Sequence, residues 1–163
     1  MEQFILRVNG EDCLVLAEPK WTLLYTLREC LGLTGTKCGC DTASCGACMV
    51  VLDGEAKKSC AVLVKNAAGK EIETIEGMKK DGVLHPIQQA FIDCGAVQCG
   101  YCTPGMVMSA KALLDKNPNP AEEEVRAAID ENLCRCTGYV KIVQAILEAG
   151  RRMNVTLKEV RHG

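Results

Sequence analysis

The sequence predicts an α+β protein in which a strand-rich N-terminal part precedes an all-α part. Apolar residues alternate at period two through much of the first half, where Asn-Gly and Asp-Gly turns interrupt them. Beyond a run of Gly, Lys and Asp at 77–82, apolar residues recur at helical spacing instead. The chain has 163 residues, 48% of them hydrophobic, which is enough for one large domain or two small ones. We therefore expect two domains, at residues 1–78 and 79–163.

The N-terminal part is expected to form a small sheet that grips one helix. Its expected elements are, in order, strands at 3–8 and 13–17 joined by Asn9-Gly10, a helix from Thr22 to Gly32, a strand at 49–52 turned by Asp53-Gly54, a partner strand that carries Cys60, and a closing strand at 71–75. The helix is indicated by the leucines at 23, 24, 27 and 31, which fall on one face. Strands packed on a single helix in this way form a β-grasp sheet.

The second part is expected to form a four-helix bundle. Each helix has a recognisable start: Pro86, the pair Thr103-Pro104, the pair Asn119-Pro120, and Thr137. Each also carries an apolar stripe at helical spacing, and four amphipathic helices of this length pack into a compact bundle. Met106 and Met108 are interpreted as core filling.

The composition excludes several classes of function. A formal net charge of -2 and only 4% aromatic residues favour neither nucleic acid nor a membrane surface as a partner. No apolar run is long enough to span a membrane, and the N-terminus lacks a basic segment followed by a long apolar stretch. Twelve cysteines in such a chain indicate metal binding in a reduced, cytoplasmic setting and not a disulfide framework.

The first candidate metal site lies in a cysteine-rich loop at 37–48. Its ligands are expected to be Cys40, Cys45, Cys48 and Cys60, in the order C-x4-C-x2-C…C. This is the plant-type ligand order for a 2Fe-2S cluster. Gly39 and Gly46 would let the backbone approach the sulfurs closely. A zinc site is the competing interpretation, but zinc knuckles use two pairs at similar short spacing, whereas here three cysteines share one loop. We therefore expect a ferredoxin-like cluster domain.

A second constellation of cysteines lies in the helical part. It consists of Cys99, Cys102, Cys134 and Cys136. Each pair precedes a helix start, expected at Thr103 and at Thr137, so four thiolates could converge where two helix N-termini meet. The partial positive charge of helix N-termini suits an anionic metal centre. From spacing alone, a four-sulfur zinc site is a serious alternative here.

Other reactive side chains are interpreted as structural. The sequence places Cys13, Cys30 and Cys94 on expected strand or helix faces, as small core residues. Cys38 stands one position before the glycine of the ligand loop, and we interpret it as a cysteine that does not bind the cluster. A role as an alternative ligand is the second interpretation. His85, which precedes Pro86 at a helix start, is expected to be structural as well.

Three stretches carry a resemblance to a known family. They are Gly39 to Cys48, Gln98 to Met106 (QCGYCTPGM) and Asn132 to Tyr139 (NLCRCTGY). Together they closely resemble the small iron-sulfur subunit of the xanthine dehydrogenase family of molybdenum hydroxylases, over about residues 4–153. The resemblance implies a 2Fe-2S cluster in each domain, with the second beside a molybdopterin cofactor on a large subunit. It also implies that Gln98 and the Cys136 backbone lie at the pterin interface.

The same resemblance implies a function. Electrons would pass from molybdenum to the helical-domain cluster, then to the ferredoxin-like cluster, and then to FAD on a medium subunit, in a heterotrimer that assembles further. The chain would have no substrate-converting site, and the large subunit would select the substrate. The sequence itself agrees, since it offers no Ser-His-Asp set, paired carboxylates or phosphate-binding loop. A zinc-binding structural or adaptor protein without a redox role is the alternative function.

Overall fold

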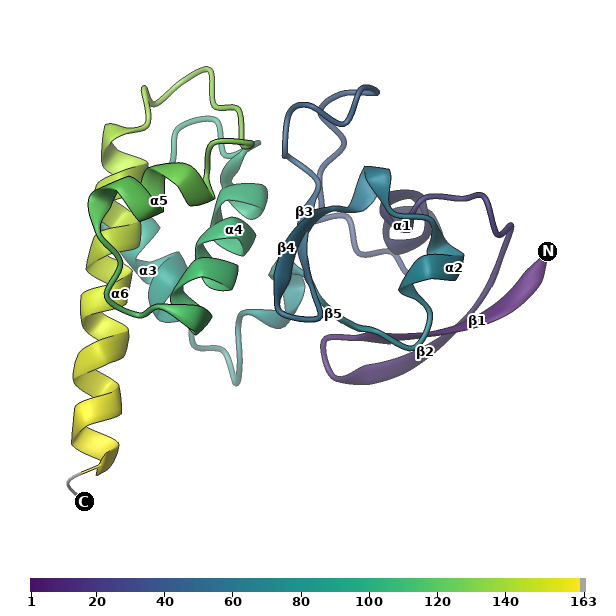
Figure 1. Ribbon diagram of the computed structural model, residues 1–163, viewed down its shortest axis with the longest axis horizontal. Helices are drawn as coiled ribbons and strands as arrows, with labels where there is room; N and C mark the ends of the chain where they lie inside the picture. Colours follow the sequence, from purple (N-terminus) through teal and green to yellow (C-terminus); the bar gives the residue numbers. More distant parts are fainter. Residues whose placement is uncertain (162–163) are drawn as a thin grey trace.

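The structure is a computed structural model that describes residues 1–161, with side chains for residues 1–154. A mixed β-sheet and a group of helices lie side by side (Figure 1). The loop before β3 and the loops before α4 and α6 lie at the same end of the molecule (Figure 1). Seven of the eight predicted cysteine ligands are on these loops, and the eighth, Cys60, follows β4.

The N-terminal part is a five-stranded sheet in the order β2-β1-β5-β3-β4. Its strands are β1 (Glu2–Val8), β2 (Glu11–Ala17), β3 (Met49–Leu52), β4 (Glu55–Lys58) and β5 (Glu71–Glu73). β1 pairs with β5 in parallel, and every other pairing is antiparallel. Both predicted hairpin turns are confirmed, because Asn9 and Gly10 have φ of 53° and 85° and Asp53 and Gly54 have φ of 50° and 78°.

The helix that the sheet grips is less regular than the sequence predicts. One α-helical turn, α1 (Leu23–Tyr25), continues as the π-helical turn η1 (Thr26–Cys30). Thr22 caps it, as its Oγ1 accepts a hydrogen bond from the Tyr25 amide at 3.1 Å. Three short elements were not predicted: η2 (Ser59–Ala61), α2 (Val64–Ala67) and η3 (Ile75–Gly77). The core between sheet and helices is formed by buried aliphatic side chains, among them Leu6, Leu23, Leu27, Val50 and Ile72.

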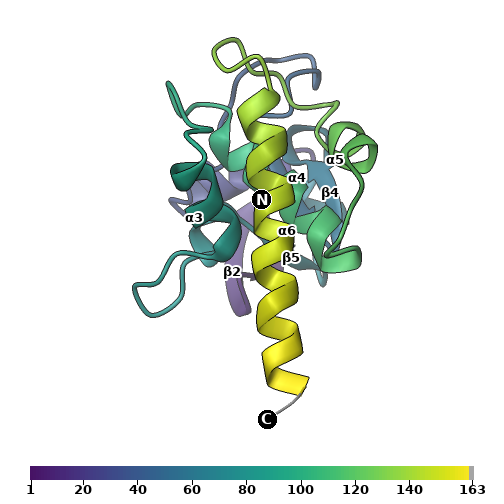
Figure 2. The same ribbon diagram turned by 90° about the vertical axis from the view of Figure 1, so that its left-hand side faces the viewer.

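The helical part contains α3 (Pro86–Asp93), α4 (Thr103–Lys116), α5 (Glu122–Ala128) and α6 (Val140–Arg161). The long helix α6 runs along the outside of the molecule, with α3 on one side and α5 on the other (Figure 2). Phe91, Met106, Met108, Ile142 and Ile146 are fully buried in its core, which confirms the interpretation of the two methionines. His85 caps α3, since its Nδ1 accepts from the Ile87 amide at 3.2 Å. Its structural interpretation is therefore confirmed.

The last helix begins later than the sequence predicts. Thr137 is not its first residue, because Gly138 and Tyr139 follow with φ of 66° and 71°, in the left-handed region. An α-helix cannot pass through such residues, so α6 starts at Val140. Tyr139 is a bulky residue in a conformation that costs free energy, which marks this turn as one held by its surroundings.

The two parts pack against each other through α4 and β3. Val51 of β3 belongs to the same buried cluster as the helical core. Ion pairs cross the boundary between Lys111 and Glu73 at 3.0 Å and between Lys58 and Glu131 at 2.8 Å. In both pairs the lysine side chain is only 15% exposed. The sheet and the helices therefore share a continuous, partly charged interface.

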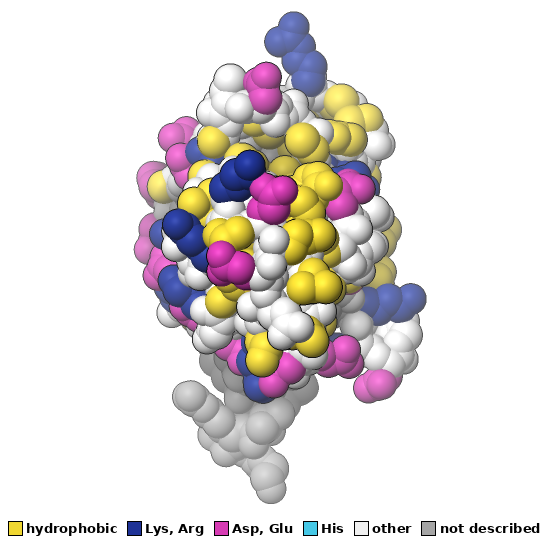
Figure 3. Space-filling model, turned by 90° about the vertical axis from the view of Figure 1, so that its right-hand side faces the viewer, with side chains coloured by type: hydrophobic (Ala, Val, Ile, Leu, Met, Phe, Trp, Pro, Cys, Tyr) yellow, Lys and Arg dark blue, Asp and Glu magenta, His cyan; other side chains and the backbone are white. Residues whose placement is uncertain are grey.

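The outer side of the N-terminal hairpin is apolar. Ile5 and Leu14 are directly paired across β1 and β2, and they are 58% and 65% exposed. Leu16, 56% exposed, lies on the same strand as Leu14. Figure 3 views this end of the molecule and shows hydrophobic side chains gathered among charged ones. Within the part of the chain that the structure describes, no helix is both long and apolar enough to cross a membrane.

Candidate metal centres

The first cysteine loop wraps its amide groups around sulfur. Residues 38–48 have no regular structure, and Ala43 and Gly46 adopt left-handed φ of 56° and 69°. Hydrogen bonds from the amides of Cys45, Thr42 and Ser44, with a contribution from the Cys45 side chain, lower the pKa of Cys40 to about 6. The Ala47 amide approaches the Cys45 sulfur at 3.5 Å. The loop thus favours the thiolate of Cys40, the form that binds metal, whereas burial raises the pKa of Cys45.

Cys60 reaches the first site from a different element than predicted. It lies in the turn η2, immediately after the hairpin formed by β3 and β4, and not on the hairpin itself. Ser59 fixes this turn, because its hydroxyl and its amide both donate to the Cys48 carbonyl, at 2.7 Å and 3.2 Å. Burial, followed by the neighbouring Cys48 thiol, raises the pKa of Cys60 to about 12.

The second site is built from two loops of the helical part. Cys99 and Cys102 precede α4, and the Tyr101 amide approaches the Cys99 sulfur at 3.5 Å. On the other loop, the Thr137 hydroxyl and amide lie 3.0 Å and 3.4 Å from the Cys134 sulfur. Burial opposes ionisation of Cys134, but these groups lower its pKa overall. Burial and the Cys134 thiol together raise the pKa of Cys102 to about 12.

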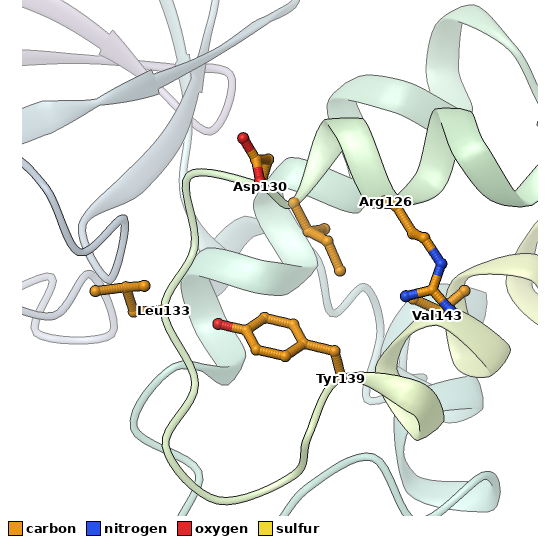
Figure 4. Close-up of a pocket in the computed structure, with 6 residues that line it drawn as sticks. Arg126, Asp130, Leu133, Tyr139 and Val143 are labelled. Atoms are coloured by element: carbon orange, nitrogen blue, oxygen red, sulfur yellow. The ribbon is translucent and has the colours of Figure 1, made fainter.

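Tyr139 holds the second of these loops in shape. Its ring lies inside the connection between α5 and α6 (Figure 4). The hydroxyl accepts a hydrogen bond from the Cys134 amide at 2.8 Å and donates one to the Asn132 carbonyl at 3.1 Å. These hydrogen bonds close the loop around the cysteines, and they compensate for the free-energy cost of the left-handed backbone at Tyr139.

Within each site the four thiols lie near one another, and they interact most strongly in twos. The interacting pairs are Cys40 with Cys45, Cys48 with Cys60, Cys102 with Cys134, and Cys99 with Cys136. A 2Fe-2S cluster has four cysteine ligands for two irons, so two thiol pairs close to one another fit it. A single tetrahedral zinc would instead need four ligands around one point.

The remaining cysteines lie outside these pairs. Cys38 is exposed, and its thiol donates only a long contact of 3.7 Å to the Cys40 carbonyl. Cys13 and Cys94 are half-buried, while Cys30 is exposed and not a core residue as expected. Gln98 is exposed and adjoins Cys99, whose thiol pairs with that of Cys136.

A buried hydrogen-bonded contact between the two sites was not predicted from the sequence. Asn132, 1% exposed, donates from Nδ2 to the Gly46 carbonyl at 3.0 Å and accepts from the Ser109 hydroxyl at 2.8 Å. The next amide, that of Leu133, donates to the Cys45 carbonyl at 2.8 Å. Glycine makes the approach possible, because a Cβ on Gly105 would lie 2.4 Å from the Gly46 oxygen. An asparagine two residues before a cysteine ligand was the available signal, but its partner lies 86 residues away.

Comparisons with known proteins agree with this geometry. Residues 6–85 match the family described as 2Fe-2S iron-sulfur cluster binding domain, and residues 74–147 match the family described as 2Fe-2S binding domain. The chain is 50% identical over 147 residues to the nicotinate dehydrogenase small FeS subunit of Eubacterium barkeri, covering 90% of this chain and 94% of the relative. It is 46% identical to the xanthine dehydrogenase iron-sulfur-binding subunit of Escherichia coli O157:H7, covering 86% and 89% of the two chains.

Solved structures show the same fold. Quinoline 2-oxidoreductase from Pseudomonas putida 86 matches with a TM-score of 0.87 and 42% identity, over 93% of this chain and 96% of that chain. The aldehyde oxidoreductase of Desulfovibrio gigas matches with a TM-score of 0.91 and 42% identity, over 96% of this chain but only 18% of that longer chain. The fold is thus a ferredoxin-like domain joined to a helical part. The chain belongs to the small iron-sulfur subunits of the xanthine dehydrogenase family of molybdenum hydroxylases.

Proposed function

We propose that this chain is the electron-transfer subunit of a molybdenum hydroxylase and that its thiol pairs bind two 2Fe-2S clusters. The first cluster would be held by Cys40, Cys45, Cys48 and Cys60, and the second by Cys99, Cys102, Cys134 and Cys136. The observation that carries the proposal is the pairing of the thiols, because each pair would hold one iron. The clusters would supply one-electron centres, and the chain's residues would hold them in series.

The surface around the second site suits the large molybdopterin-binding subunit. Cys99 and Cys136 are exposed there, so a partner could approach the cluster closely. Ile92, Val97 and Val140 lie in this part of the chain and are 57%, 40% and 56% exposed. Exposed apolar residues around a functional group are typical of a surface that a partner covers. On this basis Gln98 and the Cys136 backbone are proposed to contact the pterin, and electrons would enter here.

The first site would deliver electrons to a medium, FAD-binding subunit. Its loop is exposed at Asp41, Thr42 and Ser44, away from the contact with Asn132. The apolar patch of Ile5, Leu14 and Leu16 offers a second partner surface on the same part of the chain. We propose a heterotrimer of these subunits, which assembles further and works in the cytoplasm. The division into domains at 1–78 and 79–163, the second a four-helix bundle, is part of the same proposal.

The zinc-binding adaptor is the less favoured function. It would need four ligands around one ion, whereas a 2Fe-2S cluster shares four thiols between two irons. The relatives named above are subunits of oxidoreductases. A visible absorption spectrum separates the two functions, since zinc thiolates are colourless and oxidised 2Fe-2S centres are red-brown.

The order of electron transfer is tested by replacing one proposed cysteine ligand at each site. Nicotinate, quinoline and xanthine, taken from the names of the relatives, serve as trial substrates for the assembly. In Cys45→Ser, substrate should still reduce the second cluster within one turnover, while reduction of the flavin slows severely. In Cys136→Ser, the first cluster should stay oxidised with substrate but be reduced by dithionite. Rapid-freeze magnetic resonance follows each centre, and a first cluster that fills at the normal rate in Cys136→Ser would refute the order.

A further inference from the structure

Tyr101 connects the two cysteine sites. It lies between Cys99 and Cys102 in the sequence and therefore belongs to the second-site loop. Its hydroxyl, however, donates a hydrogen bond of 2.6 Å to the carbonyl of Cys38, 63 residues away in the first-site loop. Tyr101, which lies between two proposed ligands of the second site, thus binds the backbone just before Cys40, the first proposed ligand of the first site.

The ring of Tyr101 also covers the first-site loop. A Cβ built on Gly39 would lie 3.5 Å from the Tyr101 Cε1 atom and 3.1 Å from the Cys45 sulfur. The space at Gly39 is therefore shared by the tyrosine ring and a ligand sulfur. Tyr101, Gly39 and Cys45 line a cavity of about 290 Å³ together with the thiols of the second site. The ring forms a wall of the space between the two sets of thiols.

The two ends of the first-site loop are held by different contacts. At residues 45–46, backbone and amide hydrogen bonds from Asn132 and Leu133 are accompanied by close glycine packing, and the Asn132–Gly46 bond is buried. At residues 38–40, the described contact to the second site is made by Tyr101, whose side chain is 49% exposed overall. The end at residues 45–46 is held by buried packing, whereas the hydrogen bond that ties residues 38–40 to the second-site loop comes from the Tyr101 hydroxyl.

We propose that Tyr101 is a positioning residue for electron transfer between the two sites, holding the Cys40 end of the first-site loop at a fixed distance from the second-site loop. This inference rests on the proposed function. The transfer moves one electron, which leaves the second site and enters the first, and no covalent bond forms or breaks. Its rate falls steeply as the two sites move apart, so a single hydrogen bond that sets their separation matters to it.

The test compares Tyr101→Phe with Tyr25→Phe in the purified assembly. Both variants lose the hydroxyl of an exposed tyrosine, but the Tyr25 ring packs on Trp21 and belongs to α1, outside the two loops that Tyr101 joins. Without the Cys38 hydrogen bond, the fraction of molecules in which residues 38–40 have separated from the second-site loop should rise about fivefold. Amides at residues 39–42 should then exchange with deuterium about five times faster in Tyr101→Phe. In the fully reduced protein, the magnetic splitting between the two clusters should weaken, although each keeps its own signal. Tyr25→Phe should change neither quantity.

The outcomes separate this inference from the proposed function. Unmodified protein without two cluster signals would refute the function itself. If both signals are present, and Tyr101→Phe shows normal exchange and normal splitting, only the role of Tyr101 is overturned. Loss of the first-site signal in Tyr101→Phe would also overturn it, because the hydroxyl would then be needed to bind the cluster and not to position it.

Discussion

Gly46 offers the sharpest test of how the two cysteine sites are joined. It is buried in the first-site loop, and a Cβ there would lie 2.2 Å from the Glu131 carbonyl oxygen and 2.9 Å from Asn132 Cα. Both atoms belong to the backbone, so neither can rotate away. Bringing the shorter contact from 2.2 Å to the tolerated limit of 3.0 Å requires a movement of about 0.8 Å. Gly46→Ala should therefore push the two loops apart.

The cost follows from the hydrogen bonds that this movement would stretch. The Leu133–Cys45 bond of 2.8 Å and the Asn132–Gly46 bond of 3.0 Å would both exceed 3.5 Å, the outer limit of a useful hydrogen bond. Each buried group left without a partner costs about 1–3 kcal/mol. The left-handed φ of Gly46 adds about 1–2 kcal/mol for an alanine.

Gly69→Ala is the matched control. Its φ of 73° is close to the 69° of Gly46, but a Cβ there meets no atom within 4 Å. The difference between the variants removes the backbone term and leaves about 2–6 kcal/mol for the lost contact. For a chain of this size, that corresponds to a melting temperature roughly 5–20 °C lower in Gly46→Ala than in Gly69→Ala, measured by thermal unfolding with clusters bound. Melting temperatures within about 2 °C of each other would refute the reasoning.

Three further predictions concern other side chains at the sites. Cys38→Ser should keep full iron content and both reduced-state magnetic resonance signals, whereas Cys40→Ser should lose the first-site signal; equal loss would mean that the loop is misassigned. Asn132→Ala should cost about 2–4 kcal/mol in denaturant unfolding, and adding Ser109→Ala should cost little more, because the two side chains share one hydrogen bond; strictly additive costs would exclude the contact. Tyr139→Phe should lower stability by about 1–3 kcal/mol and shift the second-site signal only, since it leaves a loop amide and a carbonyl unpaired; an unchanged second-site signal would contradict this.

The strands were the easiest elements to predict, because their signals are local. Asn9-Gly10 and Asp53-Gly54 adopt left-handed conformations that few other residue pairs tolerate, so two adjacent residues are enough to predict each hairpin. The proline-marked start of α4 at Thr103 is equally local. The thiol spacing within 37–48, completed by Cys60, predicts a 2Fe-2S cluster, and the match of residues 6–85 to a 2Fe-2S iron-sulfur cluster binding domain agrees with it.

The remaining features depend on contacts between distant residues. The late start of α6 follows from the left-handed backbone of Tyr139. The hydrogen bond from the Tyr139 hydroxyl to the Asn132 carbonyl stabilises this turn. The π-helical turn at 26–30 ends a helix whose leucine pattern reads as a plain α-helix. Asn132 and Tyr101 could be recognised as members of sequence stretches, but their partners at Gly46 and Cys38 are visible only once the chain is folded. Hydrogen bonds across such sequence separations leave no periodic signal.

The central claim is that eight paired thiols of this chain hold two 2Fe-2S clusters, and the content of the purified protein tests it most directly. Iron, acid-labile sulfide and zinc should be measured on the same sample, together with the magnetic resonance spectrum after dithionite reduction. The account predicts about four irons and four labile sulfides per chain, with two distinct reduced-state signals. Stoichiometric zinc without labile sulfide would contradict it.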